Sequence, residues 1–209
     1  MAQFGVNPHG RWDKLLAKEA LETHVRNIVD KYKEASPEMV KGGHEWYERA
    51  HDVANKVGKG NVEKGAGIIA ALSPQTGWSR NTDLAHRLVT TGHAEHTADN
   101  LQKAQRIQAG EHPLDVLGGH KVRSFYQNIA DPSNPHPVTI DRHAHDIAVG
   151  IPFRGATKST EKAGSLGLSA IGRYQHFERA YKSASEELGI EHPHKVQATT
   201  WVQHRGAIG

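Results

Sequence analysis

Apolar residues recur at helical spacing along most of this chain. The clearest case is residues 14–33, where one stripe is formed by Leu15, Leu16, Leu21, Val25, Ile28, Val29 and Tyr32. A stripe with this period is typical of an amphipathic helix that buries one face. Asp13 is a suitable N-cap before it, and Ser36-Pro37 prevents the helix from continuing. The segment is therefore predicted to be a helix.

The same period, interrupted by glycine and proline, predicts an all-α fold. The continuous apolar run 68–72 could be a buried helix or a strand, and we favour a helix. The only strand candidate, residues 138–140, is too short to matter. Since the sequence shows no repeat and no credible linker, we predict a single compact multi-helix domain over residues 1–209, with core motifs in 60–150 on which the helices of 169–205 pack back. Further helices are expected at 43–57, 81–90, 96–108, 120–129, 141–149, 169–188 and 194–204, a helical turn at Pro113, and an exposed loop at 150–167.

The composition excludes several classes of protein. The 209 residues include no cysteine, which excludes disulfides, thiolate metal sites and cysteine nucleophiles. No apolar run approaches the roughly 18 residues of a membrane helix, and the N-terminus lacks a signal-like apolar segment. We therefore expect neither a membrane-spanning helix nor a secretory signal peptide. The net charge of +3 is weak support for a nucleic-acid partner. The 16 histidines are scattered, and most are expected at the surface.

A first polar cluster follows the apolar run at residues 68–72. It reads LSPQTGWSRN and contains Gln75, Trp78 and Asn81. Amide side chains can hydrogen-bond a base and an indole can stack on one, so these three are candidates for nucleic-acid contact. The alternative is an ordinary interhelical turn with Trp78 in the core.

A second cluster, GGHKVRSFY, joins two glycines to a basic helix start. The backbone N–H groups of Gly118 and Gly119 at a helix N-terminus suit a phosphate, and Lys121 and Arg123 add positive charge. A lysine with a depressed pKa could instead be a Schiff-base nucleophile. The spacing is not that of a P-loop, so nucleotide hydrolysis is excluded. The alternative is an ordinary helix start.

A third cluster, TIDRHAHD, places a carboxylate at the start of a helix. The helix dipole stabilises an anion there, so Asp141 is a candidate functional group. Asp141 and His145 are four residues apart and share a face, as do Arg142 and Asp146. The alternative is that Asp141 only caps the helix and that Arg142 and Asp146 form a surface ion pair. The sequence supplies no third ligand for a metal, so none is predicted.

In order and spacing, these clusters resemble the helix-hairpin-helix DNA glycosylase superfamily of endonuclease-III-like enzymes. The segment LSPQTGWSRNTDLAHRL is similar to the family's LSxQT segment, and VTIDRHAHDIAVG is similar to its VDTHVxRVxxRLG segment. The resemblance covers roughly residues 60–150. It implies that Asp141 is the catalytic carboxylate, that Arg142 and His143 follow in the motif, and that Gln75 enters DNA beside an extruded base.

The chain departs from this family in two places. The family's LPGVGRKTA hairpin is matched only by LGGHKVRSF, in which Lys121 precedes Asp141 by about the usual distance. This segment also resembles an earlier helix of the same fold, in which case the hairpin is missing and Lys121 is not the nucleophile. The family's four cysteines are absent, so no iron–sulfur cluster and no other cofactor is expected.

A closer resemblance is to small phage and actinobacterial proteins of glycosylase-like fold linked to thymine hypermodification. Their C-terminal QAxxWxxxR motif is matched by Gln197, Trp201 and Arg205, which lie on one helical face. The resemblance implies that this face lines a base pocket, whereas the alternative is helix packing around Trp201. It also implies a protein of the bacterial cytoplasm, with phage-encoded proteins among its relatives.

The resemblance therefore predicts a DNA-binding, base-flipping hydrolase that acts on a modified or damaged base. An alternative is transfer or removal of amino-acid or polyamine groups on thymine, and another is a DNA-binding module without catalysis. A less favoured alternative is a metal phosphohydrolase with His-Asp pairs, which His24, His51, Asp52 and Asp83 imitate. The sequence does not indicate the oligomeric state.

Overall fold

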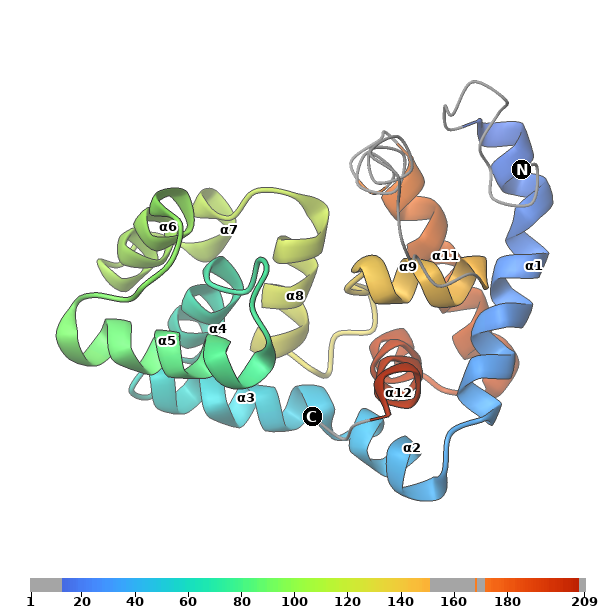
Figure 1. Ribbon diagram of the computed structural model, residues 1–209, viewed down its shortest axis with the longest axis horizontal. Coiled ribbons are helices and arrows are strands. Elements are labelled where there is room, and N and C mark those ends of the chain that lie inside the picture. Colours follow the sequence, from blue (N-terminus) through green and yellow to red (C-terminus); the bar gives the residue numbers. More distant parts are fainter. Residues whose placement is uncertain (1–12, 151–167, 169–171, 207–209) are drawn as a thin grey trace. The chain divides into compact units, whose positions relative to one another are not determined.

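The computed structural model describes residues 13–150, 168 and 172–206, and all regular secondary structure in these ranges is helical (Figure 1). Residues 138–140 have no regular secondary structure and pair with no strand in the described chain. The predicted all-α class is therefore confirmed. Within the same ranges, no helix has both the length and the apolarity needed to cross a membrane.

The helices fall into two compact units, a subdivision that the sequence analysis did not predict. Among the described residues, the first unit comprises 13–44 and 138–206, and the second comprises 45–137. The first unit contains α1 (Lys14–Lys33), α2 (Pro37–His44), α9 (Arg142–Val149), α11 (Arg173–Leu188) and α12 (Pro193–Arg205). The second contains α3 (Trp46–Val57), α4 (Val62–Ala71), α5 (Trp78–Thr91), α6 (Ala98–Gln108), α7 (Pro113–Val116) and α8 (His120–Ala130).

In the first unit, α1 packs along α11 and α9, and α12 packs on α2, α11 and α9. The C-terminal helices thus contact the two N-terminal helices as well as α9, and only residues 138–150 of the expected core motifs belong to this unit. Their shared core is aliphatic and aromatic, and its largest fully buried side chains include Ile28, Ile140, Tyr174, Phe177 and Tyr181.

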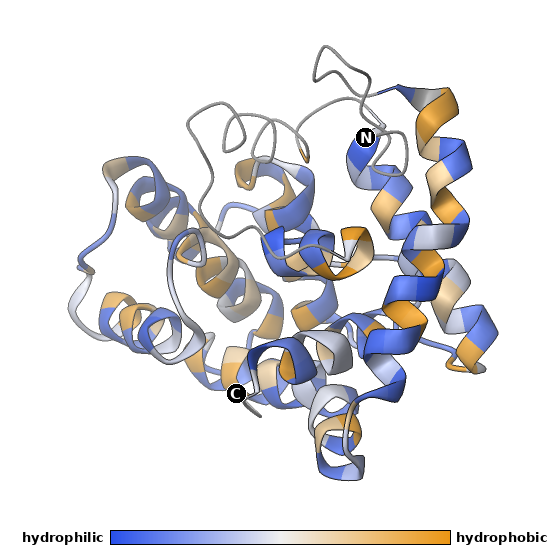
Figure 2. Ribbon diagram, turned by 45° about the vertical axis from the view of Figure 1, so that its right-hand side comes forward, coloured by the Kyte–Doolittle hydropathy of each residue, from blue (hydrophilic) through white to orange (hydrophobic). Residues whose placement is uncertain are grey.

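In the second unit, α4 is the central helix. Residues 65–72 are all buried, and α3, α6 and α8 pack around them. The small side chains of GAGIIAA permit this close packing, because a Cβ at Gly65 would lie only 1.8 Å from the carbonyl oxygen of Ala54. The expected helix at residues 68–72 is confirmed. The surrounding helices carry hydrophilic and hydrophobic residues side by side, as amphipathic helices do (Figure 2).

Most predicted helix positions are confirmed, with informative shifts at their ends. The helix expected at 43–57 is two helices, because α2 begins at Pro37 and a break at Glu45 separates it from α3. Proline fits the first turn of a helix, so Pro37 starts a helix as well as preventing α1 from continuing. The loop expected at 150–167 lies almost wholly outside the described residues.

Candidate functional site

The first predicted cluster forms a tight turn between α4 and α5. The Thr76 N–H donates to the carbonyl of Ser73, and Gln75 has φ +60°. With proline at its second position and a left-handed residue at its third, this is a type II β-turn, in which the third position favours Gly or Asn. Gln75 is exposed and is one of two non-glycine residues with positive φ in the described chain. An amide side chain is thus presented at a backbone cost of about 1–3 kcal/mol.

Trp78 joins this turn to a cluster of aromatic rings. Its ring centroid lies 4.9 Å from that of Trp46 on α3, which lies 6.1 Å from that of Phe125 on α8. These three side chains are partly exposed, whereas Tyr47, at 4.8 Å from Trp46, is buried beneath them. We call Trp46, Trp78 and Phe125 the ring cluster. It connects the first predicted cluster to the second, because Phe125 lies one turn after Lys121 on α8.

The second predicted cluster begins with an exposed glycine pair. No heavy atom lies within 4 Å of a Cβ built at Gly118 or Gly119, so the backbone here is open to approach. Helix α8 has no side-chain cap and no acidic residue in its first turn. Lys121 is partly buried and forms no ion pair with any residue the structure describes. The N-terminus of α8 therefore keeps the features that suit an anion.

Of two predicted contact residues of this unit, one is bonded to the backbone and the other is buried. The Arg123 Nη1 donates to the carbonyl oxygens of Leu114 and Leu117, at 2.6 and 3.0 Å, and so holds the end of α7. Asn81 is only 2% exposed, and its Oδ1 has no hydrogen-bond partner in the described chain. Burial keeps the Asn81 side chain from contacting a ligand at the surface.

In the first unit, Asp141 is the N-cap of α9. Its Oδ1 accepts a hydrogen bond from the Ala144 N–H at 2.8 Å, and its carboxylate is partly exposed. The segment before it is fixed by Tyr174, whose hydroxyl donates to the Val138 carbonyl at 2.7 Å and accepts from the Ile140 N–H at 3.0 Å. The second oxygen of Asp141 has no hydrogen bond to any residue that the structure describes.

Two histidines contact each other, and one of them, His204, is in the electrostatic range of this carboxylate. The ring centroids of His143 on α9 and His204 on α12 are 5.6 Å apart, and both side chains are partly exposed. Partial burial lowers the pKa of His204, and the positive charges of His143 and Lys31 lower it further. The carboxylates of Asp146 and Asp141 act in the opposite direction. His204 is therefore a neutral imidazole at pH 7, in the electrostatic reach of Asp141.

The other polar residues of α9 are buried and bonded to one another. Arg173 Nη2 lies 2.7 Å from His145 Nε2, so the arginine donates and the proton of His145 is on Nδ1, which faces the Asp146 carboxylate at 3.2 Å. Burial lowers the pKa of His145 and lowers that of Arg173 to about 10. The surface ion pair considered for Arg142 and Asp146 is therefore wrong, because Asp146 is buried against His145 while Arg142 is exposed.

The three residues of the predicted C-terminal face differ in exposure along α12. Gln197 is 5% exposed and lies in the interior. Trp201 is partly exposed, and the Arg205 guanidinium lies 5.2 Å from its ring centroid in a cation–π contact. Of this helix, His204 contacts His143, the second residue after Asp141. His204, Trp46 and Phe125 were not predicted as site residues, because their only signal in the sequence is a position inside or next to a motif.

The residues of the phosphohydrolase alternative form no metal-binding group among the described residues. His24 Nδ1 lies 2.8 Å from His176 Nε2 in the core of the first unit. His51 Nδ1 donates to the backbone carbonyl of Ile129. Across the described ranges, no group of three or more His, Asp or Glu side chains is placed to hold a metal ion. His145 is also unsuited as a metal ligand beside Asp141, because both its ring nitrogens are engaged.

The sequence matches one family model over residues 13–208, described as a family of unknown function, DUF7178. The chain belongs to this family. No curated protein and no solved structure matches it. The match spans both units, so the ring cluster and the Asp141 region both lie within the matched residues.

Proposed function

We propose that this protein binds DNA in the bacterial cytoplasm, extrudes one nucleotide and acts on its base, with Asp141 as the catalytic carboxylate. The observation that carries the proposal is the partly exposed carboxylate of Asp141 in the electrostatic range of His204, whose ring packs against that of His143. A carboxylate with an imidazole in its electrostatic range, both partly exposed, can exchange protons and stabilise positive charge. The resemblance to DNA glycosylases assigns the carboxylate to the same position of its motif.

In the proposed reaction, the glycosidic C–N bond breaks, the base leaves with the bonding electron pair and takes up a proton from solvent, and positive charge is left on the sugar. The Asp141 carboxylate stabilises that charge, and its oxygen that lacks a bond in the described chain faces the reaction. Water then adds to the sugar carbon and gives up a proton. His204 is suited to accept this proton, because the environment that lowers its pKa keeps it neutral at pH 7.

DNA contact is assigned to the exposed features of the second unit. Gln75 would fill the gap left in the base stack, and the ring cluster would stack on an unpaired base. Gly118, Gly119 and Lys121 at the start of α8 would hold a phosphate. If Lys121 instead attacks the sugar as a Schiff-base nucleophile, borohydride would trap a covalent adduct that is lost in Lys121→Ala.

The test measures binding and base release on the same duplexes. Fluorescence anisotropy reports affinity for a normal duplex, a duplex with damaged bases and one with amino-acid- or polyamine-modified thymine, and mass spectrometry reports any released group. The proposal expects base release by the wild-type protein and none by Asp141→Asn. Loss of only the thymine substituent would establish the modification alternative. Binding without chemistry, unchanged in Asp141→Asn, would establish a DNA-binding module. Absence of DNA binding would overturn the proposal.

A further inference from the structure

The loop between α5 and α6 reaches back to the turn that carries Gln75. His96 precedes the N-cap of α6, and its Nε2 lies 3.2 Å from the hydroxyl oxygen of Thr76. Thr76 is the residue directly after Gln75, and its hydroxyl donates to the carbonyl of Pro74 at 3.1 Å. The two neighbours of Gln75, Pro74 and Thr76, are therefore joined by a hydrogen bond through the Thr76 hydroxyl, which also contacts His96.

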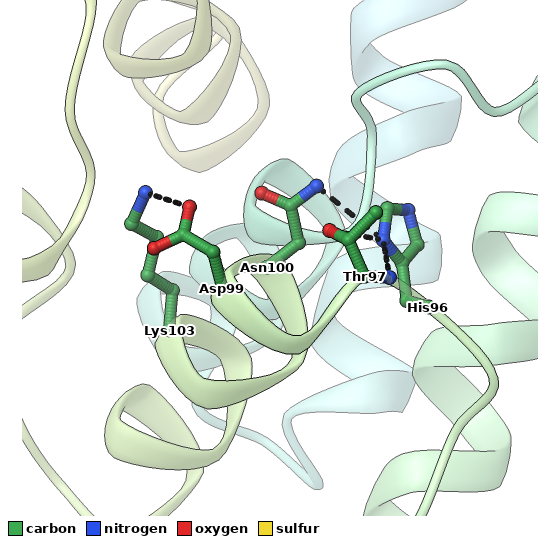
Figure 3. A network of polar contacts seen from close by, with 5 residues as sticks. All are labelled: His96, Thr97, Asp99, Asn100 and Lys103. Carbon is green, nitrogen blue, oxygen red and sulfur yellow. Dashed lines mark hydrogen bonds and ion pairs between the residues drawn. The ribbon is translucent and has the colours of Figure 1, made fainter.

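The hydrogen bonds at the start of α6 fix which ring nitrogen of His96 carries the proton (Figure 3). The Thr97 N–H points to His96 Nδ1 at 2.8 Å, and an N–H can only donate, so Nδ1 is the acceptor. The Asn100 amide nitrogen lies 3.3 Å from the same atom. The proton is therefore on Nε2, which donates to Thr76. One neutral tautomer satisfies the whole chain from α6 to the Pro74 carbonyl.

This arrangement supports a backbone that would otherwise relax. Gln75 occupies the third position of a type II turn, where its φ of +60° is unfavourable for a residue with a Cβ. The single backbone bond across the turn is long, at 3.2 Å from the Thr76 nitrogen to the Ser73 oxygen. The hydrogen bonds of Thr76 and His96 add a second constraint on the turn, from the loop before α6.

We propose that His96 is a positioning residue for Gln75, holding the glutamine in the orientation needed to occupy a gap in the base stack. The proposal rests on the proposed DNA-binding function and names a residue that the glycosylase resemblance does not assign. His96 acts through Thr76 and does not itself contact DNA.

The ring of His96 offers two hydrogen bonds that can be removed separately. In His96→Asn the amide oxygen can still accept from the Thr97 N–H, but the side chain is too short to reach Thr76. In His96→Gln the amide nitrogen reaches as far as Nε2 and can donate to Thr76. His96→Ala removes both, and Thr76→Val removes the link from the other side. His86→Ala, at an exposed histidine on α5, is the matched control.

The experiment uses the full chain and a duplex with an abasic-site analogue opposite 2-aminopurine, whose fluorescence reports a side chain entering the gap. We expect His96→Ala, His96→Asn and Thr76→Val each to weaken binding about fivefold, the size of one lost hydrogen bond, and to reduce the 2-aminopurine change. His96→Gln and His86→Ala should resemble the wild-type protein. The double variant Thr76→Val with His96→Ala should be no weaker than the weaker single variant.

The variants that each keep one of the two hydrogen bonds separate stability from positioning. The melting temperature of His96→Asn should stay closer to that of the wild-type protein than the melting temperature of His96→Ala does, although both variants bind the duplex more weakly. If His96→Gln binds as poorly as His96→Ala, or if the double variant is additive, the positioning role is overturned while wild-type binding still supports the proposed function. If the wild-type protein does not bind the gapped duplex, the proposed function has failed and the positioning role fails with it.

Discussion

Gly43 of α2 lies against the backbone of Thr199 of α12. A Cβ built at Gly43 would stand 2.4 Å from the Thr199 Cα and 2.6 Å from its nitrogen, distances that real Cβ atoms do not show. The absence of a side chain at Gly43 therefore determines how closely α12 approaches α2. Through α12 it also affects the position of His204 relative to α9.

We expect Gly43→Ala to destabilise the protein by about 3 kcal/mol, because backbone atoms, unlike a flexible side chain, cannot move aside. Chemical denaturation monitored by circular dichroism would measure this loss. Gly118→Ala is the control, since no atom lies within 4 Å of its Cβ, and it should change stability by less than about 0.5 kcal/mol. Thr199→Ala should not rescue Gly43→Ala, because the clash is with the backbone.

The buried pair His24 and His176 makes stability depend on pH. Their nearest ring nitrogens are 2.8 Å apart, and burial is the main cause that lowers the pKa of His176 from 6.5 to about 3. Below pH 6.5 the unfolded chain therefore binds a proton that the folded protein does not. The stability that the neutral ring contributes is complete above pH 6.5 and is lost as the pH falls towards 3.

We expect the free energy of unfolding to fall by up to about 1.4 kcal/mol per pH unit through this one group at pH 5 to 4. Urea unfolding of the wild-type protein and of His176→Gln at several pH values would measure it. The variant should be less stable at pH 7 but should show a shallower dependence on pH. Equal slopes for the two proteins would contradict a neutral, buried His176.

The sequence could predict single helices better than the contacts between them. The stripe at residues 14–33 and the caps Asp13 and Asp141 are local features, and the structure has all three. The ring cluster could not be predicted, because Trp46, Trp78 and Phe125 come together only when α3, α5 and α8 pack. The same holds for His204 beside α9, since nothing in the C-terminal motif indicates which face of α12 turns inward.

Burial also decided which predicted residues are available to a ligand. Gln197 and Asn81 have the right side-chain chemistry in the right motifs, but both lie in the interior. Arg123 has the right charge but bonds to the end of α7. A sequence motif specifies residue types, whereas exposure depends on the packing of neighbouring helices that lie elsewhere in the chain.

Gln75 offers a way to separate stability from DNA binding. Asn tolerates the left-handed backbone better than Gln, so Gln75→Asn should keep or raise the stability of the protein, by up to about 1 kcal/mol. The shorter side chain should reach less far into a gap in the base stack. We therefore expect unchanged or higher melting temperature together with weaker binding to a gapped duplex. Tighter binding by the more stable variant would argue against insertion of Gln75.

Asp141 is both a helix cap and the proposed catalytic carboxylate, and two substitutions separate these roles. Asparagine is also a good N-cap, so Asp141→Asn should keep the bond from the Ala144 N–H and leave stability nearly unchanged. Asp141→Ala should lose about 1 kcal/mol of stability, measured by denaturant unfolding. Both should lose base release, because neither retains the negative charge. Activity retained in Asp141→Asn would reduce Asp141 to a cap, and equal stability of the two variants would show that its cap bond does not contribute to the fold.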